Sequence, residues 1–134
     1  MKYAVLAGRI LFALIFLVGG LGHFSAQTTG YARAAGIPFA SFVVPLSGVI
    51  SIAGALSIIT GYKVKFGAWL LIIFMIPVTF FMHQFWKIQD PMMKQMDIAM
   101  FMKNLGLLGG AIFLAYFGAG PLSIDEKANK PLLA

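Results

Sequence analysis

The sequence contains no cysteine and few charged residues. The absence of cysteine excludes disulfide bonds, thiolate metal ligands and cysteine nucleophiles. Charged side chains make up 10% of the 134 residues, whereas soluble domains carry about 25%. So few charges cannot cover a surface in water, and a hydrophobic content of 60% excludes a disordered chain. The composition therefore indicates a protein that lies in a lipid bilayer.

Acidic residues are the scarcer charged type. Four Asp and Glu stand against ten Lys and Arg, which gives a formal net charge of +6. The basic residues are scattered singly, and no run is denser than Lys63-Val64-Lys65. This distribution fits anionic lipid headgroups and topology signals, and it argues against a nucleic-acid partner.

Four apolar runs are long enough to cross a membrane. A helix needs about 20 residues to cross the hydrocarbon layer. The runs cover residues 3–24, 42–60, 66–82 and 98–117, and none has a polar face at helical spacing. The sequence therefore predicts an all-α fold, with one transmembrane domain over residues 1–134 built as an integral membrane four-helix bundle.

An even number of spans places both termini on the same side of the membrane. That side receives six of the ten basic residues, which predicts cytoplasmic N and C termini. The two outer connections are expected to form short interfacial helices. Residues 28–35 begin with hydroxyl side chains and end before Gly36-Ile37-Pro38. Asp90-Pro91 is typical of a helix start, and this helix can continue into the fourth span.

Polar residues gather at the outer ends of the predicted spans. His23 ends the first span and His83 the third, Lys103 and Asn104 lie just inside the fourth, and Trp86 is close by in sequence. Ionisable groups inside a membrane are costly and indicate function. We therefore predict that these five side chains form a binding pocket at the outer membrane boundary. The alternative is a set of unrelated interface anchors, with the Lys103 stem extended toward the headgroups.

Three ligand chemistries suit these residues. A quinone needs hydrogen-bond donors, which His23, His83 and Lys103 supply, and apolar walls, which Phe85 and Trp86 supply. Haem held by both imidazoles is the weaker cofactor hypothesis, because a macrocycle must fit between four short helices. Copper(I) on a methionine face is weaker still, since methionine is a common flexible filler, and we predict no metal site. The copper ligands would be Met92, Met96 and Met100 of that face together with His83.

The inner ends of the spans hold a second polar group. Arg9 lies one to two turns into the first span, and Asp125 follows the fourth. A buried guanidinium prefers a bidentate carboxylate partner. We therefore predict a structural ion pair between Arg9 and Asp125 that locks the C-terminal segment over the bundle.

Several short motifs follow one another along the chain. They are Gly8-Arg9, FLVGGLG at 16–22, Gly30-Tyr31 with Gly36-Ile37-Pro38, HQFW at 83–86, FMKNL at 101–105 with Gly109-Gly110, and GAGPLSID at 118–125. Together they resemble the DoxX family of small bacterial inner-membrane proteins. The resemblance implies a four-helix inner-membrane protein. Relatives include a membrane subunit associated with thiosulfate:quinone oxidoreductase and a partner in a membrane-bound oxidoreductase complex. Members often carry a glutamate where this sequence has Ser51.

Two functions are consistent with these features, and whether the protein is an enzyme stays open. The first is a redox-associated accessory subunit that binds a quinone or lipid headgroup and a membrane or soluble oxidoreductase, which would supply the redox chemistry. The second is a non-enzymatic scaffold or partner-binding protein, with Gly106 and Gly110 forming the contact face of a homo-oligomer. Transport is least favoured, because four helices enclose only a narrow pathway.

Overall fold

Four long helices form the main body of the chain. The computed structural model describes residues 1–128. The long helices are α1 (Lys2–Gly22), α3 (Ala40–Thr60), α4 (Val64–Met82) and α5 (Pro91–Phe117). Each lies in a segment long and apolar enough to cross a membrane, which confirms the predicted all-α membrane fold. The short elements are α2 (Ala26–Ala34), the 3-10 turn η1 (Phe85–Lys87) and α6 (Ile124–Ala128).

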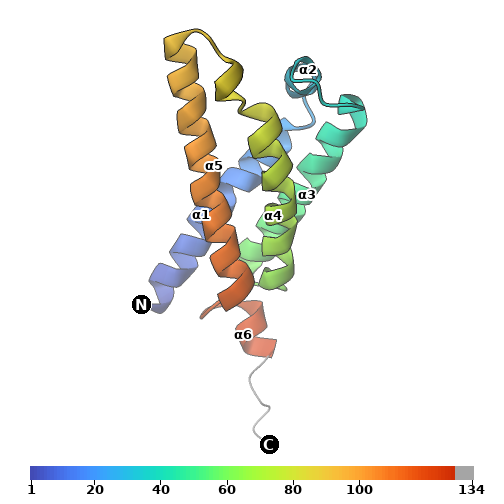
Figure 1. Ribbon diagram of the computed structural model, residues 1–134. Coiled ribbons are helices and arrows are strands. Elements are labelled where there is room, and N and C mark those ends of the chain that lie inside the picture. The colour runs from blue at the N-terminus through green and yellow to red at the C-terminus, as the bar shows by residue number, and fades with distance from the viewer. Residues whose placement is uncertain (129–134) are drawn as a thin grey trace, which may run out of the picture.

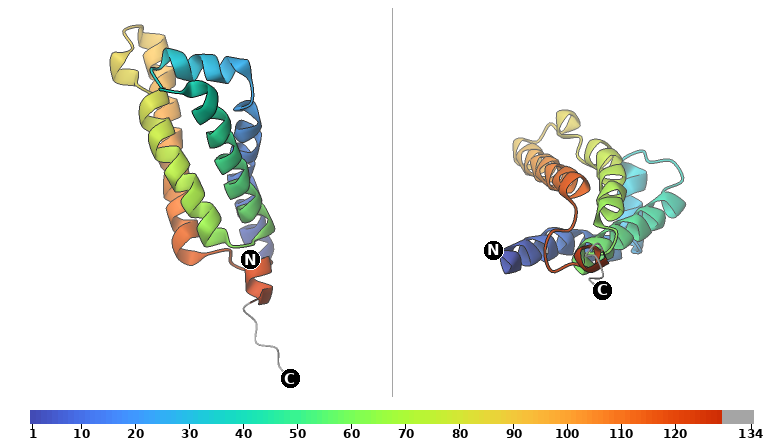
Figure 2. Two further views of the ribbon diagram at one scale, coloured as in Figure 1. Left: turned by 90° about the vertical axis from the view of Figure 1, so that its right-hand side faces the viewer. Right: turned by 90° about the horizontal axis from the view of Figure 1, so that it is seen from below.

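The helices run between two distinct ends of the molecule. The start of α1 and helix α6 lie together at one end, called here the α6 end (Figure 1). The connection through α2 and that through η1 lie at the opposite end, the α2 end, where α2 lies across the long helices (Figure 2). Helix α5 is about 40 Å long at 1.5 Å per residue, which exceeds the roughly 30 Å hydrocarbon layer. One end of α5 therefore extends past that layer.

Capping side chains fix the starts of α2 and α5 at the α2 end. The Asp90 carboxylate accepts a hydrogen bond from the Met93 amide, and Pro91 is the first residue of α5, as the sequence predicts. Helix α2 begins two residues before the predicted position, because Ser25 and not Thr28 is its N-cap. The Ser25 hydroxyl oxygen accepts from the Thr28 amide at 3.1 Å.

Helix α3 lies between α1 and α4, and α5 packs on the other side of α4. Glycines bring the backbones together at two heights. A Cβ atom on Gly48 of α3 would lie 2.9 Å from the carbonyl oxygen of Gly20 in α1. A Cβ atom on Gly67 of α4 would lie 3.1 Å from the carbonyl oxygen of Gly54 in α3. Small residues thus provide the close helix packing that lipid does not drive.

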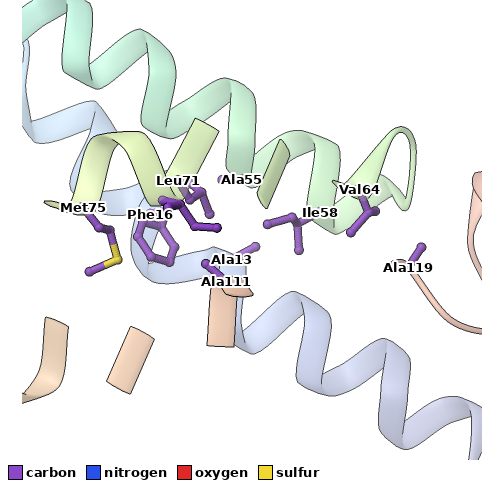
Figure 3. Packing of buried hydrophobic residues seen from close by; sticks show 10 residues of the cluster. Ala13, Phe16, Ala55, Ile58, Val64, Leu71, Met75, Ala111 and Ala119 are labelled. Carbon is purple, nitrogen blue, oxygen red and sulfur yellow. The ribbon is translucent and has the colours of Figure 1, made fainter. Parts of the chain in front are cut away.

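Small and large side chains alternate in the core between these helices. Ala13, Ala55 and Ala111 are fully buried beside Phe16 and Leu71 (Figure 3). A second, smaller cluster at the α2 end contains Ala32 of α2 with Ala40 and Val44 of α3, and Ile37 and Met82 pack against it. This second cluster holds α2 against the ends of α3 and α4.

The predicted ion pair between Arg9 and Asp125 is replaced by a different arrangement. Arg9 is 3% exposed, and its Nη1 and Nη2 donate to the carbonyl oxygens of Ala119 and Leu122 at 2.7 and 2.8 Å. These carbonyls belong to the segment that follows α5, where a helix no longer satisfies the backbone. A guanidinium with several donors can satisfy two such carbonyls at once, so Arg9 bonds to backbone and not to the carboxylate.

Asp125 instead caps the start of α4. Its two carboxylate oxygens accept hydrogen bonds from the amides of Lys63 and Val64 at 2.7 and 3.0 Å. Its own amide donates to the carbonyl oxygen of Gly61 at 2.8 Å. The C-terminal segment is therefore locked over the bundle by two separate sets of bonds. Arg9 of α1 bonds to the segment before α6, and Asp125 of α6 bonds to the α3–α4 turn. We call this arrangement the C-terminal clamp.

Replacing Arg9 with leucine should destabilise the protein. Arg9→Leu leaves two carbonyls without donors, and hydrogen bonds to charged groups contribute roughly 1.5–3 kcal/mol each. We expect a loss of about 3 kcal/mol, measured by denaturant unfolding in mild detergent with circular dichroism. The matched control is Arg33→Leu, which removes one exposed bond to Ser41 and should cost under about 1 kcal/mol. Equal stabilities of the two variants would contradict the clamp.

Candidate polar cavity between the four long helices

Four of the five predicted site residues line one cavity inside the bundle. The cavity has a volume of about 180 Å³, and all four long helices contribute to its wall. Its polar lining comes from the ends of α1 and α4 and from the middle of α3 and α5. These polar residues are His23, Ser51, His83, Lys103 and Asn104.

Asn104 is the most deeply buried of the predicted residues. It is 6% exposed and lies on α5, facing the cavity. No side chain or carbonyl among residues 1–128 forms a hydrogen bond with its amide group. Buried amides are normally hydrogen-bonded, because an unmade bond in an apolar setting is costly. The Asn104 amide thus presents a donor and an acceptor to whatever occupies the cavity.

Lys103 adds a positive charge at the same level. Its Nζ has a weak contact with the Met100 sulfur at 3.5 Å. Within the described part of the chain it forms no ion pair. An ammonium that lines a cavity in a membrane span without a carboxylate partner is free to donate to a ligand.

His83 is oriented by a carboxylate that sequence reasoning missed. Its Nδ1 lies 2.9 Å from Oδ1 of Asp97, while Oδ2 of Asp97 is buried without a hydrogen-bond partner in residues 1–128. Asp97 precedes Asn104 by seven residues, or two helical turns, and both therefore lie on the same face of α5. That spacing was the sequence signal that could have placed Asp97 beside the cavity.

His23 forms the wall of the cavity on the α3 side. Its Nδ1 lies 2.8 Å from the Ser47 hydroxyl oxygen. Its ring packs against Phe74 of α4, with 5.6 Å between the ring centroids. This position depends on Gly48, because a Cβ there would lie 2.8 Å from the His23 Cβ. The glycine contact between α1 and α3 therefore places the imidazole.

Trp86 lies outside the cavity. It is half exposed and packs edge-on against Phe85 and Phe101, with centroid distances of 5.1 and 6.3 Å. The aromatic side chains that line the cavity with His23 are Phe16 of α1 and Phe74 of α4. The HQFW segment therefore supplies one polar residue to the cavity, while its aromatic rings pack against α5.

Two other features singled out in the sequence lie outside the polar cavity. The methionines Met92, Met96 and Met100 are exposed on α5, and residues 1–128 contain no group of three or more His, Asp or Glu side chains arranged around a metal. The two glycines of the expected contact face differ. Gly110 is covered by Phe12 of the same chain, whereas nothing lies within 4 Å of a Cβ built on Gly106.

Comparison with known proteins agrees with this architecture. A family model described as DoxX matches residues 4–84. The chain belongs to the DoxX family. Inner membrane protein YqjF of Escherichia coli is 33% identical, and the match covers 94% of this chain and 92% of that protein. Inner membrane protein YphA of the same organism is 24% identical over 92% of this chain and 89% of that protein.

A more distant relative is eukaryotic. The Surfeit locus protein 4 homolog of Schizosaccharomyces pombe is 26% identical over 93% of this chain, which corresponds to 37% of that longer protein. No solved structure matches the chain. The bacterial relatives and the four apolar helices together identify this DoxX protein as a multi-pass inner-membrane protein.

The cavity of this DoxX protein should be reachable by small polar reagents. Asn104→Cys should react with a small charged methanethiosulfonate at least about tenfold faster than Ala111→Cys, because a thiol reacts as the solvated thiolate. Ala111 lies two turns further along the same face of α5 and is fully buried. The natural chain has no cysteine, so labelling of each single-cysteine protein can be measured directly by mass spectrometry. Equally slow labelling at both positions would show that the cavity is closed.

Proposed function

We propose that this DoxX protein is an accessory subunit of a membrane oxidoreductase and that its cavity binds the ring of a quinone. The observation that carries the proposal is the buried Asn104 amide, which has no partner among the described residues and lies beside Lys103 and His83. A quinone ring has two carbonyl oxygens that accept hydrogen bonds and an apolar body. Lys103, Asn104 and His83 supply donors, and Phe74 and Met75 supply apolar walls.

The size of the cavity favours a single ring over a larger cofactor. Pockets for whole ligands have volumes of roughly 300–1,000 Å³, and this cavity has about 180 Å³. A headgroup matches that volume better than a haem macrocycle. The side chains that line the cavity do not carry electrons themselves, so we assign electron delivery to a cofactor-bearing partner and ligand binding to this subunit.

Removing the Asn104 amide should weaken quinone binding. We expect Asn104→Leu to raise the Kd for a tail-less dimethoxy-methyl-benzoquinone by about 5- to 100-fold, because the site loses a buried hydrogen-bonding group. The measurement is equilibrium binding to purified protein in nanodiscs. Gln95→Leu removes an exposed amide from the same helix and should leave the Kd unchanged. No binding to the natural protein, or equal binding by both variants, would refute the proposal.

A scaffold role is the second candidate, and one observation favours it. Helix α5 buries only Asn104 and Ala111, so most of its surface, including Gly106, is free for lipid or a neighbouring membrane chain. If this role is the main one, Gly106→Leu abolishes the cellular phenotype of the protein while a double substitution of His83 and Lys103 preserves it. The opposite pattern supports the ligand-binding role.

We further propose that the α6 end faces the cytoplasm, in line with the basic residues of the α3–α4 turn. Single cysteines at Gln27 and Lys63, both exposed and at opposite ends, test this orientation. In intact cells a membrane-impermeant maleimide should label Gln27→Cys. It should label Lys63→Cys only after lysis. The reverse pattern would invert the topology.

A further inference from the structure

A second cavity, which we call the groove, lies between α3 and α4 at the α2 end. Its volume is about 430 Å³, within the range of ligand pockets and more than twice that of the polar cavity. The lining is apolar except for His23, Thr28 and Ser47. Two of these residues are already bonded internally, Thr28 to the Gly22 carbonyl oxygen and Ser47 to that of Val44. The groove therefore suits an apolar chain.

The groove follows from how α3 and α4 pack. They are in closest contact at Gly54 and Gly67, toward the α6 end, and they diverge toward the α2 end, where α2 lies between them (Figure 1). Pro45 in α3 and Pro77 in α4 lie in the diverging halves. Each proline lacks the amide hydrogen that would continue the helical bonding. The groove is thus part of the fold and not a gap left by one side chain.

Helix α2 covers the outer end of the groove. Ala32 of α2 and the following residues Ile37 and Pro38 form part of its lining. The same Ala32 is buried against Ala40 and Val44 in the second hydrophobic cluster. A ligand therefore reaches the groove from the side, between α3 and α4, where lipid surrounds the protein.

The groove and the polar cavity share one wall. His23, Phe74 and Val78 line both. The imidazole bridges the two helices, with Nδ1 on Ser47 of α3 and its ring against Phe74 of α4. A polar space of headgroup size and an apolar space of chain size thus lie on the two sides of one side chain.

We propose that the two spaces form one site for a tailed amphiphile, whose apolar chain lies in the groove and whose headgroup passes His23 into the polar cavity. This inference rests on the proposed function and deepens it, because it assigns the isoprenoid or alkyl tail of the quinone to the groove. The shared chemistry is a long apolar chain attached to a small polar head, which a phospholipid also offers. His23 separates the tail from the head.

Filling the groove should remove the contribution of the tail to the binding affinity and leave the contribution of the ring unchanged. Leu46 lines the groove on α3 and is 45% exposed, whereas Leu56 lies further along α3, toward the α6 end, and is 48% exposed. The probes are the tail-less dimethoxy-methyl-benzoquinone and the same ring with a decyl chain, bound to protein in nanodiscs. The natural protein should bind the decyl form at least about tenfold more tightly. Leu46→Trp should lower that ratio to the part that partition into the lipid supplies, and Leu56→Trp should preserve it.

The design separates the groove from its surroundings. Partition of the decyl chain into lipid is the same for all variants and cancels in the comparison. Leu46→Ala leaves the groove open and should keep the natural ratio of the two affinities. It therefore shows whether a lower ratio in Leu46→Trp comes from filling the groove. An unchanged ratio in Leu46→Trp, or no advantage of the decyl form in the natural protein, overturns the inference.

The outcomes also distinguish the inference from the proposed function. Binding of the tail-less ring reports on the polar cavity alone. One possible outcome is that the tail-less ring does not bind, while Leu46→Trp weakens binding of the decyl probe and Leu56→Trp does not. In that case the quinone proposal fails, and the groove is still a binding site for an apolar chain. A phosphatidylglycerol of matched chain length is also tested as a competitor of the decyl probe. If it competes in the natural protein but not in Leu46→Trp, lipid is an additional source of the chain.

Discussion

The close approach of α3 to two neighbours at different heights is the constraint on which the rest of the structure depends. Gly48 meets Gly20 of α1, and Gly54 meets Gly67 of α4 about two turns further along. Helix α4 touches α3 closely only at the level of Gly54 and Gly67. At the level of Gly48, where α3 touches α1, α4 can therefore diverge from α3. The groove between α3 and α4 and the placement of His23 over α3 both follow from this geometry.

Polar groups in lipid must be satisfied within the protein, and the two ends of the bundle do this differently. At the α6 end, Arg9 and Asp125 bond to backbone groups that no helix satisfies. Nε of Arg9 is the buried atom of the clamp that has no hydrogen-bond partner among residues 1–128. Around the polar cavity, the Asn104 amide and one oxygen of Asp97 lack partners among residues 1–128. We assign the clamp to architecture because its hydrogen bonds join α1, the α3–α4 turn and the C-terminal segment, and we assign the polar groups of the cavity to a ligand.

The spans could be predicted from the sequence because composition and run length determine them, and the start of α5 could be predicted from Asp90-Pro91. His23, His83, Lys103 and Asn104 were expected near one level, and they line one cavity. The partner of Arg9 could not be predicted, because backbone carbonyls that no helix satisfies have no sequence signature, and such carbonyls lie next to Arg9 after α5.

Asp97 and the groove were missed for related reasons. Asp97 lies one residue before the apolar run 98–117 and so was not counted among the polar residues of the span, although the helix predicted to begin at Pro91 already places it on the face of Asn104. The groove has no polar motif and arises from the relative tilt of α3 and α4, which short motifs do not encode. Trp86 was expected in the pocket, but it packs against Phe101.

The central claim is that the polar cavity and the groove form one site for a tailed quinone. Native mass spectrometry of the protein released directly from its own membrane tests this claim most directly. The account predicts one long-tailed quinone retained per chain in the natural protein and its loss in Asn104→Leu. A natural protein that carries no quinone, or that retains the same adducts as Asn104→Leu, would contradict it.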